Sequence, residues 1–325
     1  MTPESAGPEL PERENIWLHR FVVFTALSTT FLIFAGGLVT STESGLAVPD
    51  WPLSYGMFFP PMVGGIFYEH GHRMVAGFVG ILTFALAIWV PLKEERAWVR
   101  WLTLGALLAV ITQAILGGLT VLYLLPTPIS VAHAALAQTF FCLIISLALF
   151  TSPDWKRGLP SAGERQGSPS LPWLCGLTAA AVYLQLLMGA LMRHTKSGLA
   201  IPDFPLAFGR IIPPFESGSI MIHFAHRIGA LLVTLMVSWT LIRILSTYRN
   251  HTRLVRPILI MASLVVVQVT LGAFTIWSRK AVMITTFHVA TGAVILGISV
   301  LLTLRAFVMV APGLKAQRHP VNQPA

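Results

Sequence analysis

Two stretches of this chain repeat one another, and the repeat constrains the fold more than any other feature of the sequence. Residues 36–61 read GGLVTSTESGLAVPDWPLSYGMFFPP, and residues 189–214 read GALMRHTKSGLAIPDFPLAFGRIIPP. Aligned without a gap, 14 of the 26 positions are identical. Each copy is followed by a histidine–arginine pair and, much later, by one more histidine in an apolar stretch: His72-Arg73 with His133, and His226-Arg227 with His288. The chain is therefore predicted to be a duplicated unit.

The composition predicts a membrane protein. A soluble domain usually has about a quarter of its residues charged, whereas this chain of 325 residues has 11% charged and 55% hydrophobic residues. Apolar runs of about 20 residues recur along it, the length that crosses a lipid bilayer as a helix. In such a protein a net charge of +9 reflects loops that set orientation, and it indicates no nucleic-acid partner. Cys142 and Cys175 lie in apolar runs without metal-like spacing.

We predict an all-α polytopic membrane protein with eight transmembrane helices, arranged as two tandem four-helix repeats. The predicted spans are about 17–39, 70–92, 99–122, 130–150, 171–192, 220–245, 256–277 and 283–308. They divide the chain into a tail at 1–16, an N-terminal half at 17–150, a linker at 151–170, a C-terminal half at 171–308 and a second tail at 309–325. Four spans per repeat give both halves one orientation, so the pseudo-twofold axis is expected along the membrane normal.

Basic residues predict which side each loop faces. With the N-terminus inside, 15 of the 22 Lys and Arg residues fall on inner segments and 7 on outer ones. Cytoplasmic loops carry this excess. We therefore expect a multi-pass protein of the plasma membrane with both termini and the linker in the cytoplasm, and with the repeated loops outside.

The histidines of the two copies fall at one depth in the predicted spans. Spans two, four, six and eight run from outside to inside. His72 and His133 lie about three residues after the outer ends of theirs, and His226 and His288 occupy the matching places in spans six and eight. Two imidazoles at one level in each half match the way a helical bundle holds a heme iron from both sides. Hydrogen bonding between helices is the alternative, but ionisable groups inside membranes are costly and usually functional. A bare zinc site is disfavoured, since only Glu69 offers a further ligand.

One difference between the halves predicts different chemistry in each. Glu69 aligns with His223, so only the first half places a carboxylate three residues before its histidine, on the same helical face. Such a carboxylate is suited to accept a proton or stabilise developing positive charge, or to begin a helix favourably. Arg73 and Arg227 are expected at the outer interface, either binding heme propionates or snorkelling.

The other repeated residues predict structural roles. Asp50 and Asp203 are expected to hold turns in the outer loops through backbone contacts. His70 and His194 are expected at the outer surface. The second repeated motif, Gln-x-x-Leu-Gly, ends in small residues that permit close helix packing: Gln113 with Gly117 and Gly118, and Gln268 with Gly272 and Ala273.

Taken together, the duplicated four-span unit, the GLAVPDWP loop, the Glu69–His72-Arg73 element, and His133, His226 and His288 resemble the heme A synthase family. The resemblance covers about residues 17–308. It implies an enzyme that oxidises the C8 methyl group of heme O to the formyl group of heme A, through a hydroxymethyl intermediate, for cytochrome oxidase assembly. It also implies heme b as a bound cofactor on His226 and His288. His72 and His133 would then face the iron of the substrate heme O, with Glu69 as the catalytic carboxylate.

The resemblance implies partners as well: a heme O synthase that supplies the substrate, the cytochrome oxidase assembly machinery, and a separate electron donor. Many family members carry a cysteine pair in the first outer loop, but here the PDWPL motif is followed by Ser54 and neither outer loop contains cysteine. Two alternatives stay open at this point. One is a bis-histidine diheme electron-transfer protein, and the other is a heme transporter that leaves the heme unchanged.

Overall fold

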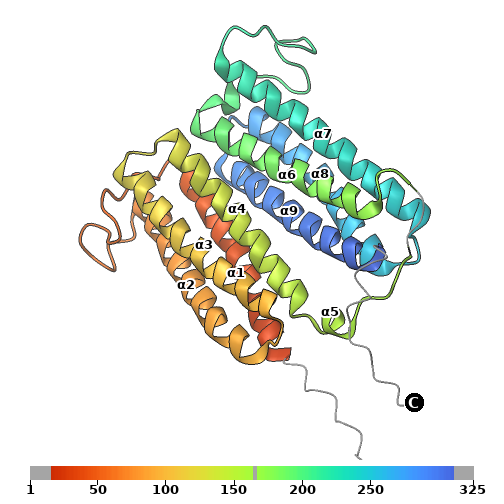
Figure 1. Ribbon diagram of the computed structural model, residues 1–325. Coiled ribbons are helices and arrows are strands. Elements are labelled where there is room, and N and C mark those ends of the chain that lie inside the picture. Colours follow the sequence, from red (N-terminus) through yellow and green to blue (C-terminus); the bar gives the residue numbers. More distant parts are fainter. Residues whose placement is uncertain (1–15, 164–166, 311–325) are drawn as a thin grey trace, which may run out of the picture.

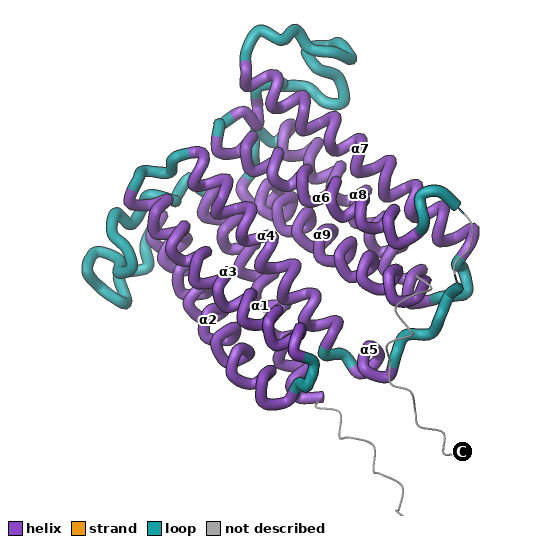
Figure 2. Tube along the Cα trace, viewed as in Figure 1, coloured by secondary structure: helices purple, strands orange, loops and turns teal. Residues whose placement is uncertain are grey.

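The computed structural model describes residues 16–163 and 167–310, and the long elements within them are all helices (Figure 1, Figure 2). The predicted tails, at 1–16 and 309–325, fall almost wholly outside the described residues. The helices are α1 (Ile16–Ser41), α2 (Gly64–Lys93), α3 (Ala97–Leu122), α4 (Thr127–Phe150), α5 (Pro153–Arg157), α6 (Leu171–His194), α7 (Gly218–Thr247), α8 (Thr252–Trp277) and α9 (Val282–Val310), with a short 3-10 turn, η1 (Ser197–Leu199).

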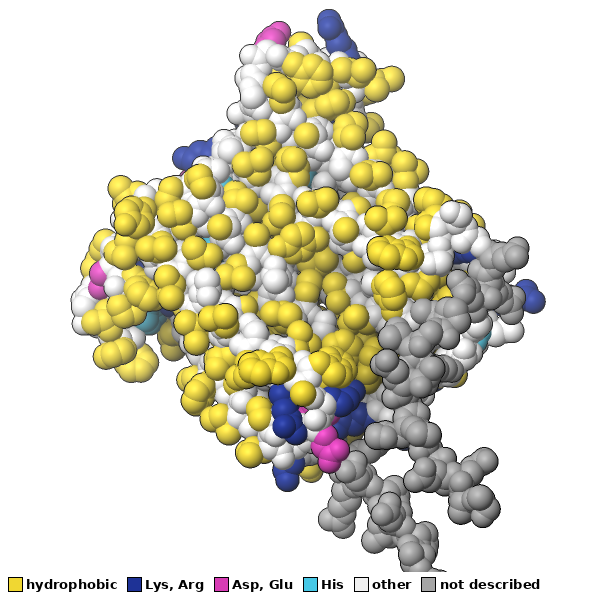
Figure 3. Space-filling model, in the orientation of Figure 1, with side chains coloured by type: hydrophobic (Ala, Val, Ile, Leu, Met, Phe, Trp, Pro, Cys, Tyr) yellow, Lys and Arg dark blue, Asp and Glu magenta, His cyan; other side chains and the backbone are white. Residues whose placement is uncertain are grey.

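The prediction of an all-α protein with eight spans is confirmed. Within the described residues, eight helices are long and apolar enough to cross a membrane, and α5 is the short exception. Helices satisfy their backbone hydrogen bonds internally, which is what an environment without water demands. Hydrophobic side chains cover the sides of the bundle in Figure 3, whereas charged side chains gather toward its ends.

The helices form two groups of four that lie side by side (Figure 1). In the first group α1 contacts α2 and α4, and α3 contacts α2 and α4; in the second, α6 contacts α7 and α9, and α8 contacts α7 and α9. Between the groups, α1 packs on α9, α6 packs on α4, and α4 packs on α9. Exchanging α1 with α6 and α4 with α9 leaves this pattern unchanged, which is consistent with the predicted pseudo-twofold relation.

The start of α1 and the end of α9 lie at the same end of the bundle as α5 (Figure 1). His19 Nδ1 lies 3.4 Å from Thr151 Oγ1, just before α5. Beyond α5, the backbone N–H of Ala162 donates to the carbonyl of Met309 over 2.7 Å. An even number of spans brings the two ends of the described chain to one side, as the orientation prediction requires.

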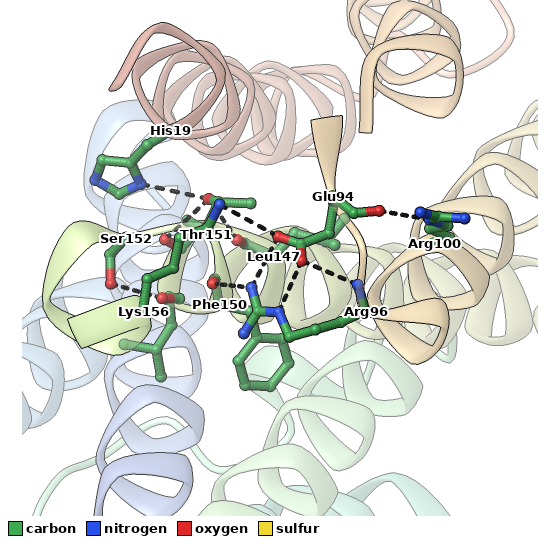
Figure 4. A network of polar contacts seen from close by, with 11 residues as sticks. His19, Glu94, Arg96, Arg100, Leu147, Phe150, Thr151, Ser152 and Lys156 are labelled. Atoms are coloured by element: carbon green, nitrogen blue, oxygen red, sulfur yellow. Dashed lines mark hydrogen bonds and ion pairs between the residues drawn. The ribbon is translucent and has the colours of Figure 1, made fainter. Parts of the chain in front are cut away.

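A buried carboxylate holds this end of the first helical group together (Figure 4). Glu94 follows α2 and is 5% exposed. Its oxygens accept from Arg96 Nε and Nη2, both over 2.8 Å, and one lies 3.5 Å from Lys156 Nζ of α5. Arg96 Nη2 also donates to the carbonyl of Phe150 at the end of α4, over 2.7 Å. The network therefore joins the α2–α3 turn to α4 and α5.

Two opposing effects set the ionisation of Glu94. Burial by itself favours the neutral acid, but the hydrogen bonds and positive charge of Arg96, with Lys156 nearby, outweigh it and lower the pKa from 4.5 to about 2. A pKa that is lower in the folded state contributes stability above the unfolded pKa and loses it as pH falls toward the folded pKa. The stabilisation from Glu94 is thus complete above pH 4.5 and disappears as the pH falls to about 2.

Replacing Glu94 with Gln should lower the thermal unfolding temperature at pH 7 by roughly 5 °C, because Arg96 and Lys156 lose their shared anion. Intrinsic tryptophan fluorescence of the detergent-solubilised protein measures this, and Glu95→Gln is the matched control, since Glu95 is an exposed neighbour. The difference between wild type and Glu94→Gln should shrink below pH 4. A constant difference from pH 7 to pH 3 would contradict the assignment.

Candidate functional site

Four histidines occupy matched places in the two helical groups. His72 and His226 lie eight residues after the first residues of α2 and α7, and His133 and His288 lie six residues after those of α4 and α9. The predicted depth of about three residues for His72 and His133 was too small, because α2 begins six residues and α4 three residues before the predicted span. At 3.6 residues per turn, each imidazole therefore projects from the second or third turn of its helix.

Each imidazole faces a glycine on a neighbouring helix. A Cβ added at Gly36 of α1 would lie 3.0 Å from His72 Cε1, and one at Gly117 of α3 would lie 3.1 Å from His133 Cε1. In the second group the distance is 3.2 Å from Gly189 of α6 to His226 Cε1, and 3.2 Å from Gly272 of α8 to His288 Cε1. Such distances are tighter than nine in ten real contacts of a Cβ, so a side chain at any of these four positions would push the ring aside by a few tenths of an ångström.

The sequence patterns did not single out two of these glycines as site residues, and they assigned the other two a different role. Gly36 and Gly189 open the repeated segments and are identical in both, and that identity is the signal that would have found them. Gly117 and Gly272 were expected to permit helix packing, and the space beside each is taken by a histidine ring. At Gly118 the neighbour is the indole of Trp51, which a Cβ would approach to 2.6 Å. The first outer loop therefore packs against α3 beside the His133 contact.

The four imidazoles suit a metal-centred ligand. All four histidines are partly accessible although helices surround them. Within the described residues, Nδ1 of His72 and Nδ1 of His133 are buried without a hydrogen-bond partner. The ring centroids of His226 and His288 are 6.5 Å apart. Two imidazoles that bind one metal ion from opposite sides, with bonds of about 2 Å, have centroids about 6 Å apart. The separation of His226 and His288 therefore fits an iron held between these two rings.

Glutamines hold three of the histidine segments in place. His288 Nδ1 lies 3.1 Å from the backbone carbonyl oxygen of Gln268. Because a carbonyl oxygen only accepts, Nδ1 carries the proton and Nε2 is left to bind a metal. Gln113 Nε2 donates to the His133 carbonyl over 2.9 Å. Gln185 Nε2 donates to the His226 carbonyl over 2.8 Å and lies 3.1 Å from its Nδ1. The repeat pattern did not identify Gln185 as a site residue, because the first repeat has Leu32 at the corresponding position.

Each outer loop contains a tight turn built around an aspartate. Asp50 accepts the backbone N–H groups of Tyr55 and Gly56 over 2.7 and 2.8 Å, and both turn residues have positive φ angles. Asp203 accepts those of Phe208 and Gly209 over the same distances. The predicted role of both aspartates is confirmed. Donation from the glycine amides lowers the pKa of both carboxyls, so the turns keep their anion at neutral pH.

Arg73 and Arg227 clamp these loops to the helices. Arg73 Nη1 donates to the carbonyls of Asp50 and Leu53 over 2.7 and 2.8 Å. Arg227 donates to the carbonyl of Asp203 over 2.6 Å and to that of Leu206 over 2.8 Å. The same contact in both halves makes loop attachment the role of these guanidinium groups in the described structure. Contact with a heme propionate stays a prediction for both.

Glu69 and His223 also perform one structural task in the two halves. Glu69 Oε2 accepts the backbone N–H of Val48 over 2.8 Å, and His223 Nδ1 accepts that of Ile201 over 3.2 Å. Both side chains are buried. Glu69 Oε1 in addition forms an ion pair with Arg73 Nη2 at 2.6 Å. A carboxylate is thus kept beside the N-terminal site, where the C-terminal half has an imidazole.

The contact between His70 and Ser54 is a second difference between the halves, and the sequence patterns did not predict it. His70 was expected at the outer surface but is 7% exposed, and its Nδ1 lies 2.8 Å from the hydroxyl of Ser54, which is fully buried. The second half has the apolar residues Ala207 and Phe224 at these positions. His194 is the last residue of α6 and is partly exposed, at the end of the helix that leads into the second repeated loop. The first loop is therefore anchored by polar contacts where the second is anchored by apolar packing.

Comparison with known proteins identifies the family. A family model described as cytochrome oxidase assembly protein matches residues 64–300, more than half of the chain. Heme A synthase from Halalkalibacterium halodurans is 30% identical over 82% of this chain and 90% of its own length. The enzyme of that name from Symbiobacterium thermophilum is 31% identical over 67% and 72%, and that from Geobacillus kaustophilus is 24% identical over 94% and 96%.

The chain belongs to the heme A synthase family. The resemblance inferred from the loop motif and the histidines is thereby confirmed. All four histidines and Glu69 fall inside the matched region, as do both arginine clamps and the second outer loop. The family match begins at the first residue of α2, so it covers six of the eight long helices described here completely and α9 as far as residue 300.

Replacing Arg227 with Gln should release the second outer loop, because the carbonyls of Asp203 and Leu206 lose their cationic donor. Trypsin cleavage after Arg210, an exposed loop residue, should then be about tenfold faster. Limited proteolysis of the purified protein, read by mass spectrometry, measures the fragment that ends at Arg210. Arg279→Gln, in the exposed turn after α8, is the control. Equal cleavage in both variants would refute the clamp.

Proposed function

We propose that this chain is a heme A synthase. It oxidises the C8 methyl group of heme O to a formyl group through a hydroxymethyl intermediate, for the biogenesis of cytochrome oxidase. The family match supports the reaction class. The observation that carries the proposal is the set of four imidazoles, two in each helical group, each opposite a glycine. That arrangement suits one heme in each half.

The C-terminal half is the proposed site of a resident heme b. His226 and His288 would hold its iron, and their centroid separation of 6.5 Å supports this pairing. The Gln268 carbonyl orients His288 so that Nε2 faces the ligand. When bound, heme b supplies one-electron redox chemistry. The protein contributes ring orientation, exclusion of water by the surrounding helices, and a loop fixed over the site by Arg227.

The N-terminal half is the proposed substrate site. His72 and His133 would face the iron of heme O, and their unpartnered Nδ1 atoms are consistent with rings that reorient when substrate enters. Glu69 is the proposed catalytic carboxylate. Its contact with Arg73 at 2.6 Å holds it in position, and a carboxylate there can accept a proton or stabilise positive charge that develops on the substrate. The first loop, held by Glu69 and Arg73 together, closes the outer end of this site.

The proposal includes a setting and partners. The protein would span the plasma membrane with both termini in the cytoplasm, as the excess of basic residues on inner segments supports. A heme O synthase would supply the substrate, and the cytochrome oxidase assembly machinery would receive the product. Electrons would come from a separate donor. Because the outer loops contain no cysteine, thiol exchange in these loops is not part of the proposal.

A diheme electron-transfer protein is the second candidate, and one observation favours it: the histidine–glycine pairs are the same in both halves. The differences at Glu69 and His223, and at Ser54 and Ala207, favour the enzyme, since electron transfer has no use for a carboxylate in one half only. A heme transporter would likewise leave heme O chemically unchanged. Product analysis therefore separates the candidates.

Cells that make heme O should accumulate heme A, or its hydroxymethyl precursor, when this protein is produced in them. Glu69→Gln should reduce that yield by about a hundredfold or more, because the carboxylate is the proposed proton acceptor. Heme extraction followed by reverse-phase chromatography measures both. Glu95→Gln is the control. Unaltered heme O with wild-type protein would favour electron transfer or transport, and full heme A yield with Glu69→Gln would remove Glu69 from the mechanism.

Variants of the two histidine pairs should differ in how much heme b they retain. His288→Ala should purify with little or no heme b, because one of its two proposed ligands is gone. His133→Ala should retain heme b at the wild-type ratio of heme to protein while losing heme A production. A pyridine hemochrome assay on purified protein measures the ratio. Loss of heme b in His133→Ala with full retention in His288→Ala would reverse the assignment of the halves.

A further inference from the structure

Arg193 lies where the two helical groups meet. It is in the last turn of α6, and its Nη2 donates across to α1, to the Gly37 carbonyl over 2.9 Å and to Ser41 Oγ over 2.8 Å. Ser41 Oγ in turn accepts from Thr286 Oγ1 of α9 over 3.1 Å. Three helices from the two groups therefore converge on one guanidinium at the outer end of the bundle.

Arg193 lies on the same helix as part of the proposed cofactor site. It follows Gly189 by four residues, so the two share one face of α6, with Arg193 one turn nearer the outer end. Gly189 is the glycine against which the His226 ring packs. Thr286, the far member of the cluster, precedes His288 by two residues. The contacts of Arg193 therefore lead, through Ser41 and Thr286, to within two residues of His288 in the chain.

The charge of Arg193 has no anionic partner among the described residues. Its hydrogen bonds there go to a carbonyl and a hydroxyl, which are neutral groups. A cation within a membrane span is costly, and it normally pairs with an anion or marks a functional site. Arg227, the other candidate in this half, has Nη1 and Nη2 bound to loop carbonyls. A heme carries two propionate carboxylates, and Arg is well suited to bind a carboxylate.

The N-terminal half lacks this cation. The residue four positions after Gly36 is Thr40, and its hydroxyl donates to the carbonyl of Gly36 over 2.9 Å within its own helix. We infer that Arg193 binds a propionate of heme b and so retains the cofactor in the C-terminal half, whereas the N-terminal half, with Thr40, lets its heme exchange. This inference rests on the proposed resident heme b.

Replacing Arg193 with Gln should speed the release of heme b from the purified protein to excess apomyoglobin by about tenfold, since one charge-assisted contact is lost. Protein made in a heme-deficient host and loaded with heme b or with its dimethyl ester tests the chemistry directly. Wild type should release the ester about tenfold faster than heme b. Arg193→Gln should release both at one rate, because the contact that distinguishes them is gone.

Three further variants separate propionate binding from a purely structural contact. Ser41→Ala removes one of the two contacts of Arg193 with α1, leaves the one to the Gly37 carbonyl and keeps the cation, so heme b should leave at the wild-type rate. Arg193→Lys should restore part of the retention, and Arg279→Gln should have no effect. Fast release from Ser41→Ala equal to that from Arg193→Gln, or an ester effect that persists in Arg193→Gln, would overturn the inference. Wild-type protein that binds no heme b would overturn the proposed function, and the inference with it.

Discussion

The close contact between an imidazole and a glycine backbone is the interaction on which the rest of this structure depends. Inside a membrane a histidine needs either a hydrogen-bond partner or a ligand, and a ring that is to hold a ligand also needs room. Glycine on the facing helix provides that room four times, opposite His72, His133, His226 and His288. These four contacts set how closely α1 approaches α2, α3 approaches α4, α6 approaches α7, and α8 approaches α9.

The outer loops are one scaffold used twice. In both, an aspartate holds a turn and an arginine holds the loop to the helix below, so the two loops are held in the same way. The chemistry differs only at the residues that fasten the loop from underneath. Glu69 and His223 accept the corresponding loop amide in the two halves, but one is a carboxylate and the other an imidazole. A duplicated fold can in this way keep its shape while its halves take different tasks.

Polar groups also join the parts of the bundle at its two ends. At the end that carries α5, Glu94 binds Arg96 and Lys156 and so fastens α2, α4 and α5 to one another (Figure 4). At the opposite end, Arg193 bridges α6 to α1, and hence one half to the other. The first network contains its own anion, whereas the second has only neutral partners within the described residues. The presence of an anionic partner makes the Glu94 network a structural ion pair, and its absence among the described residues makes Arg193 a candidate for binding an anionic ligand.

The sequence by itself determined the eight helices, the duplication, the four histidines and the aspartate turns, because hydropathy, repeat spacing and turn chemistry are local properties of the chain. The tertiary structure decided what each of these residues faces. Gly117 meets an imidazole, His70 is buried against Ser54, and Arg193 reaches a helix 152 positions earlier in the chain. The helix starts were also misplaced, since Gly64 precedes its apolar run. Such contacts depend on how helices cross, and no local pattern in the sequence encodes that geometry.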